Sequence, residues 1–311
     1  MKKDIKKFGL ILCFVFVILL LNYSVPVALA QEKSSANEVQ VGVYVLNLGK
    51  FDVATGGFTV DFYLDLKCAD NCSPENFEFV NGRATSIDKI IDEPNEKFYR
   101  IQANLNSPVD LKRFPFDSQK MQIILEDKKN TIEDLRYIPL TEESGLDESI
   151  AFSGWKIDGW EVNTSEHEYK VYDETYSQYV FTVDISRIKS NSFFKTFLPV
   201  LVIMLIVLVS FLMDPDKITS RLTIATSSLV ASVMFHISIA NQIPPTGYLT
   251  IADKFMILTY IILLFVVIFN VILLELHERK KVELMEKLHR NTEYSAFVIV
   301  ALIYIIFFIF V

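Results

Sequence analysis

The sequence lacks the short motifs that would place it among the common enzyme classes. It contains no Gly-x-Ser-x-Gly, no His-Glu-x-x-His and no phosphate-cradling Gly-Lys-Ser/Thr segment. Of its four histidines, only His167 lies in the part predicted to be water-soluble. We therefore expect no enzymatic activity, no bound cofactor and no metal site. A membrane-anchored enzyme is the first alternative function to consider, and these absences count against it.

Cysteine is scarce, with three residues in a chain of 311. Cys13 lies in an apolar segment that reads as part of an export signal, which leaves Cys68 and Cys72 as the mature pair. In an oxidising compartment a disulfide across this turn is favoured over free thiols. A metal site would need more ligands than this pair offers.

The N-terminus combines positive charge, an apolar run and small residues. Four lysines stand within the first seven positions, and they precede the apolar run from Phe8 to Leu21 and the segment Ala28-Leu29-Ala30. This order is typical of a secretory signal peptide covering residues 1–30. The short apolar core and the small residues favour cleavage after Ala30 over a fifth membrane-spanning helix.

Hydrophobic residues make up 51% of the chain and are unevenly distributed. Residues 31–190 carry 29 Asp and Glu against 17 Lys and Arg, a balance of −12, and should attract cations and repel nucleic acid. Four apolar segments follow, each long enough to cross a bilayer core of about 30 Å as a helix. They cover about residues 193–213, 222–243, 255–276 and 294–311.

Residues 31–190 contain short runs in which apolar and polar side chains alternate, separated by Pro, Gly, Asn and Asp. This alternation predicts half-buried strands, and the lack of helical patterns between them predicts an all-β, immunoglobulin-like sandwich. The predicted strands are Gln40 to Val45, Phe58 to Leu66, Lys97 to Leu105, Gln119 to Leu125, Trp155 to Val162 and Gln178 to Ile188.

A basic cluster sets the predicted orientation in the membrane. The short stretch 277–291 contains five Lys and Arg residues, which favours a cytoplasmic loop. With an exported sandwich and an even number of spans, the C-terminus at Val311 would also lie outside. The chain is thus predicted to be a multi-pass protein of the plasma membrane.

The second apolar segment is the least hydrophobic of the four, and a set of its residues recurs at steps of four and three on one helical face. Copies of this helix around an axis would line a pore with an apolar constriction that gates by dewetting. A helix buried in a bundle, with hydroxyls bonded to its own carbonyls, is the alternative. His236, off this face, is a functional candidate or a hydrogen-bond partner of a neighbouring helix. The predicted pore-lining residues are Thr223, Ser227, Val230, Met234, Ile237 and Asn241.

The hexapeptide from Phe114 to Gln119, Phe-Pro-Phe-Asp-Ser-Gln, resembles the signature of one receptor family. That family is the pentameric ligand-gated (Cys-loop) ion channels, whose signature reads aromatic-Pro-Phe-Asp-x-Gln. Later landmarks are similar in order: Arg187 ends the last strand, Pro199 lies in the first helix, Arg221 opens the second and Pro244 follows it. The ordered set makes the resemblance far more specific than the hexapeptide alone.

Two features resemble the prokaryotic members of this family. Ser107 and Met121 stand where animal members have the cysteines of their disulfide loop, and the stretch 277–291 leaves no large cytoplasmic domain. The resemblance implies a homopentamer, in which the chain joins four identical subunits in the bilayer, with the second helix lining the pore. The implied function is a channel for small monovalent ions, opened by a small-molecule or ionic agonist at subunit interfaces.

The resemblance also implies a junction that couples the sandwich to the pore. Asp117 and Arg187 have the charges of an ion pair there, which Asp52 would join. Such a pair strongly biases a two-state element, or it serves only as a structural staple. The prolines of the loop from Pro244 to Tyr248 would stiffen the surface that receives the movement. The implied coupling residues are Asp52, Pro115, Phe116, Asp117, Arg187 and Pro244.

The agonist side departs from the family pattern. The loop after the signature strand carries Glu126-Asp127-Lys128-Lys129 where amine-gated members have an aromatic residue, so an aromatic box for a cation is not supported. Three tyrosines fall in what resembles the loop that caps the agonist, although ordinary strand packing also explains them. The possible agonist site is Glu126, Asp127, Tyr169, Tyr172 and Tyr176.

Ion selection rests on the segment that opens the second helix. Cation-selective members usually carry Glu just before the position of Arg221, but Thr219 and Ser220 stand here. These three residues are the predicted selectivity region, and the acidic outer domain alone favours cations over anions. A non-conducting membrane receptor is the alternative function. A secondary transporter is disfavoured, because the four segments show no repeat and no charge at mid-membrane.

Overall fold

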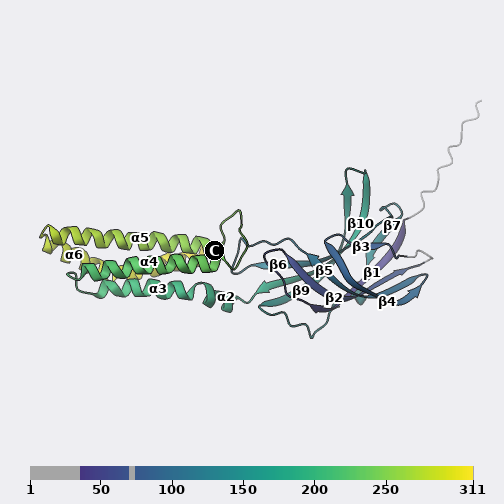
Figure 1. The fold of residues 1–311 in the computed structure, drawn as a ribbon, viewed down its shortest axis with the longest axis horizontal. Coiled ribbons are helices and arrows are strands. Elements are labelled where there is room, and N and C mark those ends of the chain that lie inside the picture. The colour runs from purple at the N-terminus through teal and green to yellow at the C-terminus, as the bar shows by residue number, and fades with distance from the viewer. Residues whose placement is uncertain (1–35, 70–73, 311) are drawn as a thin grey trace, which may run out of the picture. The chain divides into compact units, whose positions relative to one another are not determined.

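The computed structural model describes residues 36–69 and 74–310, and these form one compact unit. Strands make up the N-terminal part of this unit and helices the C-terminal part (Figure 1). The predicted signal peptide, residues 1–30, lies outside the described residues, and so does Cys72. Cys68 is disulfide-bonded, and its pairing with Cys72 stays a prediction.

Two sheets form the sandwich. The larger has the strand order β4-β5-β2-β1-β7, with β8 also paired to β1, and the smaller has the order β3-β6-β10-β9. The larger sheet consists of β1 (Asn37–Leu48), β2 (Gly57–Cys68), β4 (Gly82–Glu93), β5 (Glu96–Asn106), β7 (Leu135–Pro139) and β8 (Gly145–Leu146). The smaller consists of β3 (Phe77–Phe79), β6 (Ser118–Asp127), β9 (Trp155–Tyr169) and β10 (Glu174–Arg187).

All six predicted strands are present, as β1, β2, β5, β6, β9 and β10, and the alternation of side chains explains why. On β5, for example, successive residues alternate between buried and exposed along almost the whole strand. The other four strands were missed. In β4 nearly every side chain is exposed, so its sequence shows no alternation, and β3 and β8 are only three and two residues long.

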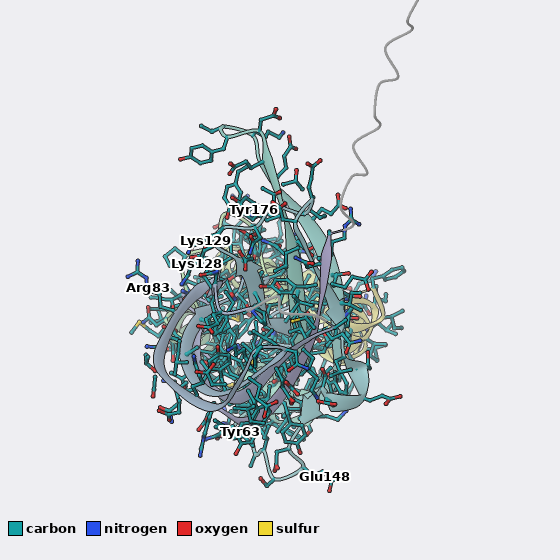
Figure 2. The ribbon with its side chains drawn as sticks, turned by 90° about the vertical axis from the view of Figure 1, so that its right-hand side faces the viewer. Tyr63, Arg83, Lys128, Lys129, Glu148 and Tyr176 are labelled. Atoms are coloured by element: carbon teal, nitrogen blue, oxygen red, sulfur yellow. The ribbon has the colours of Figure 1, made fainter. Side chains whose placement is uncertain are left out.

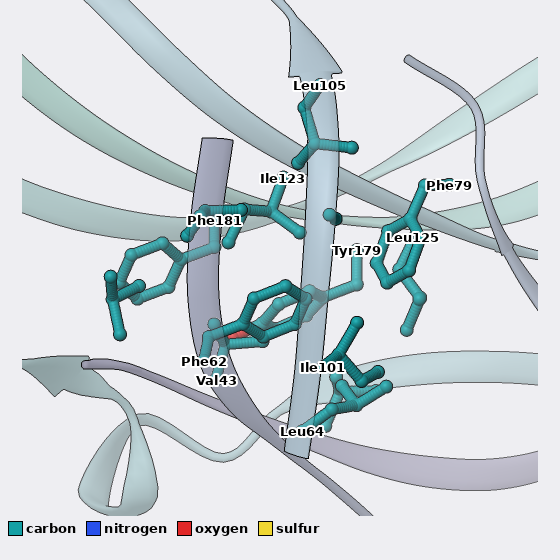
Figure 3. Close-up of a cluster of buried hydrophobic side chains, with 14 of the residues drawn as sticks. Val43, Phe62, Leu64, Phe79, Ile101, Leu105, Ile123, Leu125, Tyr179 and Phe181 are labelled. Carbon is teal, nitrogen blue, oxygen red and sulfur yellow. The ribbon is translucent and has the colours of Figure 1, made fainter. Parts of the chain in front are cut away.

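The core lies between the two sheets and is built from the inward-facing residues of both. Phe62, Leu64 and Ile101 come from the larger sheet, and Tyr179 and Phe181 come from the smaller. All five are fully buried, and Figure 3 shows them in one cluster. Burial of such large apolar side chains is the main favourable term in folding. The core therefore fixes the register of β2, β5 and β10, and with it the position of the polar residues at the ends of these strands.

The turn between β1 and β2 depends on one glycine. Gly56 has a φ of 73°, in the left-handed region, and a Cβ atom there would lie 2.0 Å from the Ser107 carbonyl oxygen. The Ser107 amide donates a hydrogen bond to the Gly56 carbonyl at 2.9 Å. Because Ser107 precedes the signature loop, this close approach holds the turn against that loop.

The helical part contains two helices that are each long and apolar enough to cross a membrane, α4 and α5, or up to four spans if each bent helix pair counts as one. One bent pair is α2 with α3 and η2, and the other is α6 with α7. The helices are α2 (Lys189–Thr196), α3 (Leu198–Val209), η2 (Ser210–Leu212), α4 (Ile218–Ala240), α5 (Ile251–Glu278), α6 (Val282–Glu293) and α7 (Ser295–Phe310).

The stretch 277–291 is not the simple loop that the sequence predicted. Most of it is the helix α6, which packs Met285 and His289 against the other helices. These two residues lie four positions apart and therefore on the same helical face. The high charge of the segment concealed this buried stripe.

The core makes one prediction about stability. Phe181→Ala removes a fully buried ring that stacks on Trp160 with centroids 5.5 Å apart, and we expect it to lower the free energy of unfolding by about 3–5 kcal/mol. Both tryptophans lie in β9, so intrinsic fluorescence during urea unfolding in detergent reports on the sandwich. Ile87→Ala, at a half-exposed position, is the control. Equal stability of the two variants would contradict this assignment of the core.

Candidate functional site

The signature loop ends in a buried ion pair. Asp117 at the start of the β6 region is 1% exposed, and its Oδ1 lies 2.6 Å from Nε of Arg187 at the end of β10. The Gln119 amide donates to the other carboxylate oxygen at 2.8 Å, and the Arg187 backbone amide donates to the Asp117 carbonyl at 3.2 Å. The predicted Asp117–Arg187 pair is thus present, and it ties β6 to β10 where both strands meet the helices.

Two aromatic rings hold the Arg187 guanidinium in place. Its central carbon lies 4.5 Å from the centre of the Trp155 ring and 5.1 Å from that of Phe114. Cation–π contact of this kind stabilises a guanidinium that has lost much of its water. Phe114 belongs to the signature loop, where it precedes Pro115 through a cis peptide bond. Arg187 therefore joins three segments: the loop, β9 and β10.

Asp52 does not join this network in the part of the chain that the structure describes. Its carboxylate accepts hydrogen bonds from the Ala54 amide and the Thr55 hydroxyl, both at 2.9 Å. The Ala54 amide and the Thr55 hydroxyl hold the pKa of Asp52 below its usual range. The prediction that Asp52 extends the ion pair is corrected, because the turn itself satisfies this carboxylate.

The signature loop contacts the helical part directly. The Phe114 carbonyl accepts a hydrogen bond from the Ala252 amide at 3.1 Å, and the Phe116 ring stacks on Phe197 with centroids 5.6 Å apart. The Tyr248 hydroxyl accepts from the Leu111 amide at 2.9 Å. Tyr248 follows Pro244 in the loop between α4 and α5. The loop that was predicted to receive movement from the sandwich is therefore in contact with it.

The predicted stripe on α4 is left uncovered by the rest of the chain that the structure describes. Val230 and Met234 are each 62% exposed, and Ile237 is 50% exposed. Thr223, Ser227 and Asn241 are exposed as well. The opposite side of α4 packs against α3 and α5. The alternative interpretation of the hydroxyls also has support, because three hydroxyls of α4 donate to carbonyls of the same helix. They are those of Thr223, Thr226 and Ser232, and the distances are 2.9, 2.9 and 2.8 Å.

Arg221 is corrected as a selectivity residue. The side chain is 0% exposed, its guanidinium lies 5.0 Å from the centre of the Phe211 ring, and its Nη1 is 3.3 Å from Nδ1 of His289 in α6. Its charge is therefore enclosed within the chain itself, whereas Thr219 and Ser220 are exposed. The pattern of one helix could not reveal that α6 and η2 cover this position.

His236 bonds to a neighbouring helix, as the simpler interpretation proposed. Nδ1 lies 2.9 Å from the Tyr260 hydroxyl and Nε2 lies 3.1 Å from the Asp253 carboxylate, both on α5. Asp253 also accepts from the Thr250 amide and hydroxyl at 2.9 and 2.8 Å, in the capping box that begins α5. The histidine thus links the C-terminal part of α4 to the first turn of α5.

At the other end of β6, Glu126 forms the centre of a second polar cluster. This carboxylate is 2% exposed. It accepts hydrogen bonds from the Tyr169 hydroxyl at 3.0 Å and the Gln178 amide at 2.8 Å, and it lies 3.0 Å from Nδ1 of His167. Burial and the hydrogen bond to Glu126 raise the pKa of Tyr169 to about 12. A buried carboxylate held by three partners is rigid and preorganised.

The structure brings all five predicted agonist-site residues to one cavity of about 170 Å³. Tyr169 and Tyr176 meet edge to face with centroids 5.6 Å apart, whereas Tyr172 at the hairpin tip is 71% exposed. Asp127 points to its own loop, where it accepts from the Lys129 and Asn130 amides at 2.8 and 2.7 Å. Sequence reasoning missed five residues of this site: Glu78, Lys128, His167, Glu174 and Gln178.

A larger neighbouring cavity of about 440 Å³ shares Glu78, Lys128 and Tyr169 with the first. Figure 2 shows Tyr176, Lys128 and Arg83 along one side of the sandwich. The cavity walls thus mix carboxylates, ammonium and guanidinium groups and phenols. Such walls suit a small polar or charged ligand. Among the described residues, no cluster of His, Cys, Asp and Glu is suited to a metal ion.

Comparison with known proteins finds relatives that are named as ion channels or receptor subunits. Residues 196–304 match the family described as the neurotransmitter-gated ion-channel transmembrane region. The chain is 23% identical to a proton-gated ion channel of Gloeobacter violaceus over 264 residues, which cover 76% of this chain and 72% of that protein. It is 24% identical to ligand-gated ion channel 50 of Caenorhabditis elegans, covering 65% and 41%. It is also 24% identical to the human glycine receptor subunit beta, covering 51% and 32%. The chain thus spans less than half of the two animal relatives.

The buried pair predicts a strong energetic coupling. Arg187→Gln leaves the Asp117 carboxylate buried without its cation, and we expect a loss of about 3–5 kcal/mol in the free energy of unfolding. The double variant with Asp117→Asn should lose less than the two single changes together. Urea unfolding followed by fluorescence of Trp155, which contacts Arg187, measures the cycle.

An exposed pair between strands of the same sheet provides the control. Lys120 and Glu161 lie 3.1 Å apart, and about half of each side chain is exposed. Solvent screens such a pair, so its cycle should give a much smaller coupling energy. Equal coupling energies in the two cycles would show that the Asp117–Arg187 pair stabilises the fold no more than an exposed pair does.

Proposed function

Because the chain is a prokaryotic-type relative of the pentameric ligand-gated (Cys-loop) ion channels, we propose that it is one subunit of a homopentameric channel opened by a small-molecule or ionic agonist. The match over residues 196–304 and the curated relatives confirm the predicted family and a membrane protein. These relatives are ion channels rather than enzymes. Five identical subunits, four spans in each, and an extracytoplasmic sandwich and C-terminus are parts of the proposal.

The observation that carries this proposal is the way two paired strands join the two polar sites. β6 begins beside Asp117 and reaches Glu126, and its partner β10 runs from Tyr176 past Gln178 to Arg187. Nine to ten residues of strand at about 3.3 Å each make a lever of roughly 30 Å. Ligand contact at the cavity would thus move the ion pair, and with it the signature loop on the helices.

The exposed stripe on α4 supports a pore. In a pentamer, this uncovered stripe of α4 would face either lipid or the central axis. Hydroxyls at Thr223 and Ser227 and the amide of Asn241 gain nothing from lipid, whereas rings of them would hydrate ions. Val230, Met234 and Ile237 would form the apolar constriction that closes by dewetting.

Selectivity for cations is proposed from the electrostatic field alone. The exported part carries an excess of twelve negative charges over residues 31–190, which raises the local concentration of cations at the pore entrance. Enclosure of Arg221 in its own subunit removes the one positive side chain of the selectivity region from the permeation path. Thr219 and Ser220 would then present only hydroxyls and backbone to the ion.

Electrical recording tests the proposal. Expression in oocytes or planar bilayers should give current when pH and small amines are scanned, and Val230→Ser should raise the open probability because it hydrates the apolar constriction. Val202→Ser, at a position 47% exposed on α3, is the matched control and should leave gating unchanged. The reversal potential under a salt gradient should show cation selectivity.

Two outcomes would change the proposal. Absence of current from well-assembled pentamers under all conditions, the Val230→Ser form included, would favour a non-conducting receptor. An equal effect of Val230→Ser and Val202→Ser would place α4 away from the pore axis. Anion-selective current would still support a channel, but it would contradict the electrostatic argument for cation selectivity.

A further inference from the structure

One lysine on β2 is shared by three carboxylates outside the two sites described above. Nζ of Lys67 lies 2.8 Å from Oδ2 of Asp65, 2.6 Å from Oε2 of Glu143 and 3.8 Å from Oε1 of Glu96. Glu143 ends η1 (Thr141–Glu143), a single turn that lies over the β1–β2 pair. The cluster therefore fixes η1 to the larger sheet with one cation for three acids.

Asp65 is the buried member of this cluster. Its side chain is 8% exposed, against 47% for Glu143. Oδ2 contacts Lys67, whereas Oδ1 is buried and has no hydrogen-bond partner among the described residues. A charged carboxylate that is half satisfied in a buried place is costly, and a proton on that oxygen removes the cost.

The second acid makes the cost larger. Glu143 contacts the same Lys67 ammonium as Asp65, and two carboxylates held on one ammonium cannot both stay ionised without repulsion. Burial raises the pKa of Asp65 to about 6, and the contact with Glu143 adds to the rise while Lys67 opposes it. The pKa of Glu143 is lowered, chiefly by its hydrogen bond from Lys67. The burial of Asp65 and the exposure of Glu143 thus both favour a proton on Asp65 rather than on Glu143.

Among the described residues, the strand neighbours of Asp65 add no other charge. Its register partners are Gly42 in β1 and Phe98 in β5, and neither side chain titrates. A Cβ at Gly42 would lie 3.4 Å from that of Glu143 and 3.6 Å from that of Asp65, so η1 sits directly above this glycine. The groups that face Asp65 are therefore Lys67 on its own strand and Glu143 on η1, with Glu96 of β5 acting through Lys67.

We propose that Asp65 and Glu143 form a proton-binding site, and that proton uptake there fastens η1 to the sandwich and so makes channel gating sensitive to weak acid. The part that concerns gating rests on the function proposed above. The part that concerns proton binding and η1 does not.

The residue after η1 shows how this site would reach the rest of the molecule. The Ser144 hydroxyl donates to the Leu140 carbonyl at 2.9 Å and accepts from the Val43 amide at 3.2 Å. It also lies 3.3 Å from the hydroxyl of Tyr179 in β10. β10 continues to Arg187, so looser or tighter packing of η1 acts on the strand that ends in the coupling pair.

The sign of the pH effect follows from the direction of the shift. A carboxyl whose pKa is raised by folding stabilises the folded state while it is protonated, and this contribution is lost as pH rises through the folded-state pKa. For Asp65 the loss therefore falls around pH 6. Weak acid should tighten η1 on the sheet, and neutral pH should loosen it.

Infrared difference spectroscopy of the full chain in detergent tests proton binding directly. We expect a carboxylic-acid band that disappears as pH rises through about 6, and Asp65→Asn should abolish it. Glu142→Gln alters the exposed neighbour of Glu143 on the same turn and should leave the band intact. A wild-type spectrum without such a band, or a band that survives in Asp65→Asn, would overturn the proposal.

Hydrogen exchange measures the packing of η1. After correction for the intrinsic rate, amides of residues 140–146 should exchange roughly tenfold more slowly at about pH 5 than at about pH 7.5. Asp65→Asn, which mimics the protonated form, should be slow at both values. Glu143→Gln, at a half-exposed position that tolerates change, should also lose the pH dependence, and Glu142→Gln should keep it. The same pH dependence in all four proteins would overturn the proposed role of the pair.

Current recording separates this inference from the proposed function. Agonist-evoked current in the wild type and in Glu142→Gln should change between these pH values, and current in Asp65→Asn should not. If current is present but has the same pH dependence in Asp65→Asn, the gating role is wrong. If no protein conducts, the proposed channel function fails, and the infrared and exchange results still decide the proton site.

Discussion

The buried ion pair between Asp117 and Arg187 is the constraint around which the two parts of the molecule are organised. A carboxylate that is 1% exposed must have a cation or several donors, and here it has both Arg187 and Gln119. The pair fastens the ends of two neighbouring strands, and Phe114 covers the guanidinium. The signature loop that results offers its backbone and its aromatic rings to α5 and α3.

A second consequence is that one pair of strands connects the ion pair to the polar cluster around Glu126. The far ends of the same two strands carry Glu126 and Gln178, which bond to each other beside the cavity of about 170 Å³. Their inner faces are locked by core residues such as Tyr179 and Phe181, which are fully buried. A close-packed core resists bending, so the two strands form a stiff connection between their two polar ends. The tertiary structure thus gives a physical reason for two distant polar clusters on one pair of strands.

Prediction from the sequence succeeded where burial repeats at a short period. Strands with one face in the core alternate, and β1, β2, β5, β6, β9 and β10 were found for this reason. β4 was missed because both its faces are largely exposed, and α6 because charge hid its two buried residues. At the cavity of about 170 Å³ the five expected residues do meet, but Glu78 and His167 lie beside them without any signal in the local pattern.

The sequence by itself determined the all-β domain, the apolar segments and the family signature, because periodicity, length and a contiguous motif are local properties of a chain. Only the tertiary structure decided which side chains share a cation or a cavity. Lys67 and Glu143 are 76 positions apart and meet because η1 folds over the β1–β2 pair. Arg221 is enclosed because α6 and η2 cover it. Asp52 accepts hydrogen bonds within its own turn and so does not reach the ion pair. Such contacts depend on sheet register and helix packing, which no single segment encodes.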